Sequence, residues 1–121
     1  MKSFNVALAA SISLAMASIS AGAQDAYVIG INSALTGPGA STVAGAAEGL
    51  KLYIEKLNKS GGINGRQVKL VVQDDQGEPS KAAANAKKLL TQDNVSLLIN
   101  TSLSSTFAPM IAEAQRAGVP L

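Results

Sequence analysis

Cysteine, histidine and tryptophan are absent from this chain of 121 residues, which has only two tyrosines and two phenylalanines. Without cysteine the chain offers no disulfide, thiolate nucleophile, cysteine-ligated metal site or point of lipid attachment. Without histidine it contains no Ser-His pair, and a Gly-x-Ser-x-Gly motif is also missing. The sequence therefore predicts neither an enzyme nor a cofactor or metal site, and catalysis would require residues from outside this segment.

The charged residues do not indicate a nucleic-acid partner. Ten lysine and arginine residues against eight acidic residues give a formal net charge of +2, and the two kinds are interspersed rather than clustered. Nucleic-acid binding usually depends on a concentrated basic surface and on aromatic rings that stack against bases. With so few aromatic residues the chain has no such stacking platform, and we expect it to bind no nucleic acid.

The first residues predict a cleaved export signal. Lys2 provides a positive start, an apolar stretch follows at 6–19, and small residues lead to an Ala-x-Ala site that ends at Ala23. The apolar stretch is shorter than the ~20 residues of a membrane-spanning helix, which disfavours a retained anchor. We expect a signal peptide at 1–23, a mature segment at 24–121 and free diffusion in a bacterial periplasm.

Three apolar strands alternate with three helices in the remaining sequence. The strands are short and continuously apolar, and the helices carry apolar residues at helical spacing. Two adjacent glycines end the first helix, and Pro79 stands where a helix prefers to begin. The predicted strands are 27–32, 67–72 and 95–99. The predicted helices are 43–59, a second that begins at 79, and 108–118. The second helix has a predicted buried stripe at Ala82, Ala83, Ala86, Leu89 and Leu90.

This alternation predicts an α/β fold, in which a parallel sheet built from three βα units carries helices on both faces. The continuous apolar strands agree, because a parallel sheet is covered on both sides. The last residues, 119–121, look like the start of a fourth strand. Since a sheet that stopped there would expose apolar surface and unpaired backbone, we expect the chain to be part of a longer protein, a partial lobe.

Ligands of open α/β sheets bind beyond the carboxyl ends of the strands. Each predicted strand is followed there by a loop rich in small polar or acidic residues, and these exit loops are the candidate sites. They cover residues 33–42, 73–79 and 100–106.

The first exit loop contains Gly37-x-Gly39, which resembles the start of a dinucleotide-binding motif. Thr42 stands where the third glycine of that motif would allow close packing of helix on strand, so a nucleotide site is disfavoured. The loop instead predicts a flexible segment whose Ser41 and Thr42 face a cleft at the start of the first helix.

The second exit loop contains Asp74, Asp75 and Glu78. Paired acids can bind a metal or act as general acid and base. Adjacent residues at a strand end usually point in opposite directions, however, and an acid just before a helix interacts favourably with the helix dipole. We therefore expect mainly structural or capping roles for these acids.

The third exit loop has five hydroxyl-bearing residues within the six positions 101–106. One of them can cap the third helix while the others are solvated in a turn. Alternatively, several hydroxyls, free backbone N–H groups and the positive end of a helix dipole together form a cradle for a carboxylate. Physical reasoning alone leaves both interpretations open. Ser104, Ser105 and Thr106, next to the expected helix start, are the candidates for either role.

Three motifs follow one another along the chain. They are Leu35-Thr36-Gly37-Pro38, Asn58-x-x-Gly61-Gly62-Ile63 and Asp74-Asp75. With these motifs the segment resembles the N-terminal lobe of the leucine/isoleucine/valine-binding proteins, type I periplasmic solute-binding proteins that serve ABC importers. The resemblance covers essentially the whole segment after the signal peptide. It implies a protein of two lobes that holds a solute between them and catalyses no reaction.

The resemblance also implies roles for the candidate residues. Ser104 matches a position whose hydroxyl touches the carboxylate of an amino acid, and Ser105 and Thr106 would add hydroxyl or main-chain contacts. Thr42 falls where some relatives carry an aromatic residue over the ligand. These four residues are the predicted ligand-binding set.

The implied function is that of the substrate-binding subunit of an ABC importer. It would bind a branched-chain or other amino acid, or a similar small carboxylate, in the periplasm and deliver it to a permease in the inner membrane. Relatives that take up amides, urea or aromatic acids leave the identity of the solute open. A ligand-sensing receptor domain of the same fold is the main alternative, which a transmembrane or kinase segment elsewhere in the protein would mark.

Overall fold

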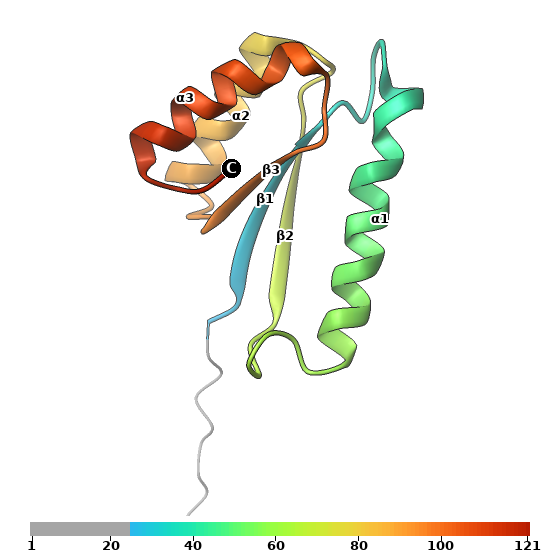
Figure 1. Cartoon of the computed structure of the whole chain (residues 1–121), viewed down its shortest axis with the longest axis vertical. Coiled ribbons are helices and arrows are strands. Elements are labelled where there is room, and N and C mark those ends of the chain that lie inside the picture. The colour runs from blue at the N-terminus through green and yellow to red at the C-terminus, as the bar shows by residue number, and fades with distance from the viewer. Residues whose placement is uncertain (1–24) are drawn as a thin grey trace, which may run out of the picture.

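The computed structural model describes residues 25–121. The signal peptide predicted at 1–23 lies outside the described residues. The three strands and three helices predicted from 27 to 118 are present, with ends a few residues from the predicted ones (Figure 1). In chain order the elements are β1 (Tyr27–Ser33), α1 (Ala40–Lys59), β2 (Val68–Asp74), α2 (Pro79–Thr91), β3 (Leu97–Asn100), the 3-10 turn η1 (Ser104–Thr106) and α3 (Phe107–Ala117).

The three strands form one parallel sheet in the order β2-β1-β3, so β1 is the central strand. In the register, Ile31 lies between Val72 of β2 and Ile99 of β3. Helix α1 covers one face of the sheet, and α2 and α3 cover the other (Figure 1). The predicted fold, a parallel sheet with helices on both faces, is confirmed. Because all three strands run toward the same end, the upper one in Figure 1, their exit loops meet there.

The main core lies between the sheet and the helices α2 and α3. Gly30 lets this layer approach β1, because a Cβ atom there would lie 3.0 Å from a methyl carbon of Leu89 and 3.1 Å from one of Leu98. Protein interiors are close-packed, so a larger residue would have to displace its neighbours. The predicted stripe of α2 is buried at three of its five positions and half-buried at the other two. The buried residues of this core are Ala82, Ala86, Leu89, Val95, Leu98, Met110 and Ala114.

Helix α1 follows a turn at its start and is bound to the sheet at its end. It begins at Ala40, earlier than the predicted residue 43, because a turn closes directly before it: the Ala40 N–H donates to Gly37 O at 3.3 Å. At the other end, the Asn58 side chain binds the backbone of β2. Its Nδ2 donates to Val68 O and its Oδ1 accepts from Val68 N–H, both at 2.8 Å. The turn makes the first residues of α1 the end of the first exit loop.

Residues 119–121, predicted as the start of a fourth strand, form no strand. They make one backbone hydrogen bond to the edge of β3. The Leu98 N–H, on the edge of β3 away from β1, donates a 2.9 Å hydrogen bond to Pro120 O. Such a bond is of the kind that joins neighbouring strands. Within residues 25–121, no helix combines the length and the apolar character needed to cross a membrane.

Candidate functional site

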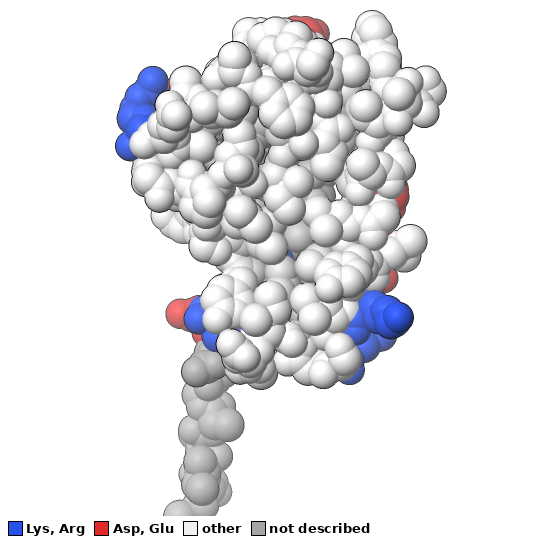
Figure 2. Space-filling model, in the orientation of Figure 1, with Lys and Arg blue, Asp and Glu red and all other residues white. Residues whose placement is uncertain are grey.

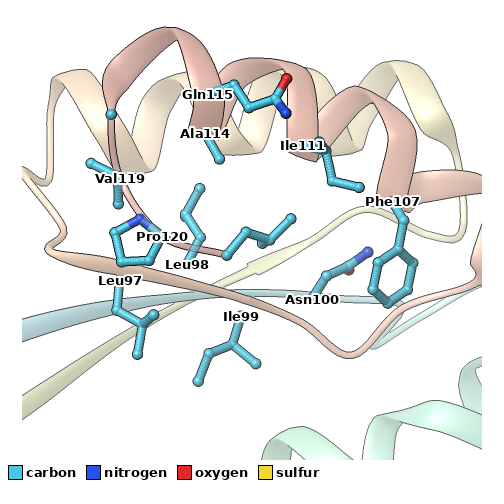
Figure 3. A pocket seen from close by; sticks show the side chains of 12 residues that line it. Leu97, Leu98, Ile99, Asn100, Phe107, Ile111, Ala114, Gln115, Val119 and Pro120 are labelled. Atoms are coloured by element: carbon cyan, nitrogen blue, oxygen red, sulfur yellow. The ribbon is translucent and has the colours of Figure 1, made fainter.

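A groove of about 820 Å³ runs along β3 under α3 (Figure 3). Its lining is mostly apolar and includes Ile99 of β3 and Phe107 and Ile111 of α3. Small-molecule sites need a few convergent polar groups in addition to apolar walls. Asn100 also lines the groove, but its amide is engaged by hydrogen bonds within the protein. The groove is therefore a weaker candidate for a polar solute than the exit loops.

Leu103 of the third exit loop packs against the other two loops. A Cβ atom on Gly39 would lie 2.9 Å from a Leu103 methyl carbon, and one on Gly77 would lie 2.7 Å from the other. Both glycines have positive φ, at 92° and 77°. A side chain at either position would displace Leu103 and strain the backbone. Leu103 therefore provides an apolar contact that joins all three exit loops.

A buried polar network centred on Asn32 of β1 connects the same loops. Asn32 Nδ2 donates to Asp75 Oδ2 at 2.6 Å and to Asn100 Oδ1 at 3.1 Å. Asn32 Oδ1 accepts from Asn85 Nδ2 of α2 at 2.9 Å. Asn32 and Asp75 are both fully buried. One side-chain amide thus links the three strand ends to α2.

The network holds the third exit loop at two points. At the first, Ser102 Oγ donates to Asp75 Oδ1 at 2.7 Å, and the Ser102 N–H donates to Asn100 Oδ1 at 3.2 Å. At the second, Asn100 Nδ2 donates to Thr106 Oγ1 at 2.9 Å, and Thr106 Oγ1 donates to Leu103 O at 2.7 Å. Buried polar groups are costly unless they are paired. These bonds therefore favour one arrangement of the loop over others.

Asp74 and Asp75 make contacts with different parts of the molecule. Asp74 holds the first exit loop: its Oδ1 accepts from the Leu35 N–H at 2.9 Å, and its Oδ2 accepts from the Thr36 hydroxyl at 2.5 Å. Burial by itself would raise the pKa of Asp74, but the hydrogen bonds from the Thr36 hydroxyl and from backbone N–H groups outweigh it and lower the pKa. These contacts agree with the structural role predicted for the acids. Residues 25–121 contain no cluster of three or more potential metal-ligating side chains.

Ser104 and Ser105 are the exposed residues of the third exit loop. They lie in η1, the turn that leads into α3. Residues 25–121 provide no hydrogen-bond acceptor for the backbone N–H groups of these two serines. Unused N–H groups at the start of a helix carry partial positive charge and favour anions. Two of the predicted contact residues therefore combine exposed hydroxyls with unused backbone donors.

Thr106 and Thr42, the other predicted contact residues, lie in different surroundings. Thr106 is fully buried, and its hydroxyl faces inward to the polar network. Although Thr106 is the N-cap residue of α3, it makes no side-chain capping bond, so the alternative that a hydroxyl caps this helix is wrong. Thr42 is exposed in the first turn of α1, three residues after Gly39, which lies against Leu103. The N-cap of the helix that carries Thr42 therefore lies against Leu103, the residue before the two serines.

The three exit loops contain no lysine or arginine, and their charged residues are the acids Asp74, Asp75 and Glu78. On the face shown in Figure 2, charged side chains lie mainly at the rims and toward the lower end, and most of the upper part is uncharged. A solute at the exit loops would therefore be bound by hydroxyl and N–H groups rather than by a cluster of cations.

Residues 26–121 match the sequence model of a protein family described as periplasmic binding protein. The chain belongs to this family. It is 36% identical over 92 residues to an amino acid binding protein from Pseudomonas aeruginosa, an alignment that covers 76% of this chain and 25% of that protein. It is 30% identical over 115 residues to Leu/Ile/Val-binding protein homolog 3 from Brucella melitensis, covering 95% of this chain and 30% of the relative.

A solved structure supports the same relationship. It is the branched-chain amino acid transporter substrate binding protein LivJ from Streptococcus pneumoniae, in complex with isoleucine, with a TM-score of 0.76 and 33% sequence identity. The match covers 79% of this chain and 28% of that one. The predicted resemblance to leucine/isoleucine/valine-binding proteins is confirmed. The chain spans no more than about a third of the length of these periplasmic binding proteins.

Sequence reasoning overlooked most of the network in this periplasmic binding protein. Asn32, Asn100 and Asn85 were not singled out, and Ser102 was not separated from the other hydroxyls. One signal was available: Asn32 lies near the end of one apolar strand and Asn100 at the end of another, and the register places them side by side. Asn85 interrupts a run of alanines on α2 and carried no comparable signal.

Proposed function

We propose that this chain is part of a substrate-binding subunit of an ABC importer. The subunit binds a branched-chain or other amino acid, or a similar small carboxylate, in the periplasm. It delivers the solute to a permease in the inner membrane without changing it chemically. Amides, urea and aromatic acids are the alternative solutes.

The observation that carries this proposal is the combination found at Ser104 and Ser105. Their hydroxyls are exposed, their backbone N–H groups have no acceptor within residues 25–121, and the helix that follows directs its positive end toward them. This donor set suits a carboxylate, which accepts hydrogen bonds but donates none. In this proposal the two serines bind the carboxylate of the solute.

The two threonines receive different roles. The exposed Thr42 borders the solute from the start of α1, in a position suited to contact the rest of the molecule. Thr106 is buried with its hydroxyl already in use, so we assign it the task of holding the loop in place. The names of the relatives, which include amino acid and Leu/Ile/Val binding, support an amino acid as the solute.

The energetics require a second lobe. A hydrogen bond to a charged ligand contributes about 1.5–3 kcal/mol, so two or three such bonds supply roughly 5 kcal/mol. Binding in the micromolar range needs about 8 kcal/mol. The difference would come from a second lobe that closes over the solute by a hinge motion. Residues 25–121 alone are therefore expected to bind weakly.

The solute is tested on the full-length gene product by thermal shift and calorimetric titration with leucine, isoleucine, glutamate, urea and benzoate. A ligand that binds only the folded state raises the melting temperature, and we expect this effect with an amino acid. The double variant Ser104→Ala/Ser105→Ala should weaken binding by about 100-fold or more, as loss of two bonds to a charged group predicts. Ser96→Ala, at the opposite end of the sheet, is the matched control. A response to none of the carboxylates would reject the proposal, and a response only to urea would change the solute class.

Delivery and location need separate tests. Deletion of the gene should reduce uptake of the solute identified by titration, and the unmodified gene should restore uptake where the double serine variant does not. Osmotic shock should release the protein with the periplasmic fraction. Its recovery with membranes would contradict the proposed location.

A further inference from the structure

We propose that Asn32 is a positioning residue for solute binding, which acts through Asp75 and Asn100 on the loop that carries Ser104 and Ser105. Asn32 is fully buried and touches no solute itself. The inference rests on the function proposed above. It states that the affinity of Ser104 and Ser105 for the solute depends partly on the buried side chain of Asn32.

The first argument is the direction of the hydrogen bonds. Three donors converge on the Asp75 carboxylate: Asn32 Nδ2, the Ser102 hydroxyl and the Gly77 N–H. Because a carboxylate only accepts, Nδ2 of Asn32 must face Asp75, and its Oδ1 must face the Asn85 amide. The side-chain amide of Asn32 therefore has a single orientation that satisfies its partners.

The same orientation is passed on to β3. Asn32 Nδ2 also donates to Asn100 Oδ1, so the Nδ2 of Asn100 is directed to the Thr106 hydroxyl. Thr106 then donates to Leu103 O. Each donor in this chain is fixed by the group before it. Reversal of the Asn32 amide would place an acceptor opposite the acceptors of Asp75 and Asn100, and a donor opposite the donor of Asn85.

The second argument is the placement of the serines between two anchors. Ser102 precedes them and is bound to Asp75 and Asn100, and Thr106 follows them and is bound to Asn100. Both anchors therefore depend on partners of Asn32. A loop held in its binding conformation loses less conformational entropy when the solute binds.

The test compares two network variants with a core variant in the full-length protein. Asn32→Asp keeps the size of the side chain but places a second carboxylate against Asp75. Ser102→Ala is milder and removes only the hydroxyl anchor, in case Asn32→Asp does not fold. Val95→Ala is the control for stability, because Val95 is buried just before the start of β3, at the end away from the exit loops, and has no part in the network.

Two quantities are measured for each folded variant, well below its melting temperature. The first is the dissociation constant of the solute, which should rise about 3- to 10-fold in Ser102→Ala and more in Asn32→Asp, but not in Val95→Ala. The second is the amide chemical shift of Ser104 and Ser105 by NMR without solute. These signals should move in the network variants and stay in place in Val95→Ala.

The two measurements separate this inference from the proposed function. If the unmodified protein binds no solute, the proposed function fails, and the amide signals still decide whether the network positions the loop. If the protein binds solute and Ser102→Ala binds equally well with unmoved amide signals, the positioning role is overturned. An equal loss of affinity in Val95→Ala would also overturn it, because the effect would then follow stability alone.

Discussion

Asn32 Nδ2 lies 2.6 Å from Asp75 Oδ2, and neither side chain is exposed to solvent among the described residues. No lysine or arginine forms a salt bridge with Asp75 in residues 25–121. The carboxylate is instead compensated by three hydrogen-bond donors, as a buried charge requires.

Asp75→Asn should destabilise the protein by about 1–3 kcal/mol, although it changes the size of the side chain very little. The new amide would keep two of the three hydrogen bonds but would place a donor opposite Asn32 Nδ2, leaving buried donors without an acceptor. Urea denaturation followed by circular dichroism measures the loss. Glu48→Gln on the exposed surface of α1 is the control and should show no measurable change. Equal stability of the two variants would contradict the compensation described here.

Asp74 should make stability depend on pH in the acid range. Its pKa is lowered in the folded protein from an ordinary value of 3.8, so the unfolded state binds a proton more readily. Its contribution is therefore present above pH 3.8 and is lost as the pH falls through the lower pKa of the folded state. In Asp74→Asn this component disappears at every pH. The stability difference between the two proteins should be constant from pH 5 to 8 and should shrink below pH 4. If the stability difference instead grew as the pH fell, the pKa of Asp74 would be raised by folding, which would contradict this prediction.

Gly77→Ala should destabilise the protein by about 1–3 kcal/mol. Its φ is 77°, and the added methyl group would meet Leu103 at 2.7 Å, so the backbone is strained and the apolar contact is displaced. Gly45→Ala makes the same chemical change inside α1, where the new methyl group meets open space. This control should be stabilising by about 0.5–1 kcal/mol, because alanine favours a helix over glycine. Chemical denaturation of the pair measures both values, and equal signs would contradict the role of Gly77.

Leu98→Ala should cost about 2–5 kcal/mol, because Leu98 is 1% exposed and lies in the core between the sheet and the α2–α3 layer. The control is Leu52→Ala, since Leu52 is 66% exposed on α1. That change should stay within about 0.5 kcal/mol. The free energies of unfolding are compared from the midpoints of denaturant unfolding, provided that the slope of the transition is the same in all variants. A small effect at Leu98 would mean that the core can repack.

The alternation of strands and helices was predictable because each element has a strong local signal. The apolar strands, the stripe on α2, Pro79 at the start of α2 and the paired glycines after α1 all appear in the structure as expected. The start of α1 was missed because a glycine-containing turn closed directly into the helix, which a hydrophobic pattern does not reveal. Element boundaries depend on such single hydrogen bonds.

The site was less predictable because it depends on contacts between distant segments. The hydroxyl run of the third exit loop is visible in the sequence, but its members separate into exposed serines and the buried Ser102 and Thr106. That division is set by Asn32 and Asp75, which lie 70 and 27 positions before Ser102. No local pattern around residues 101–106 contains this information, so sequence reasoning could place the site but could not assign its side chains.

The hydrogen bond from Leu98 N–H to Pro120 O lies on the outer edge of β3. The residues of this strand line the mostly apolar groove under α3. A strand edge of this kind is a template for pairing with other chains. Residues 25–121 produced by themselves should therefore self-associate as their concentration rises, and dilute, cold handling or a soluble fusion partner would be needed before their solution behaviour could be studied.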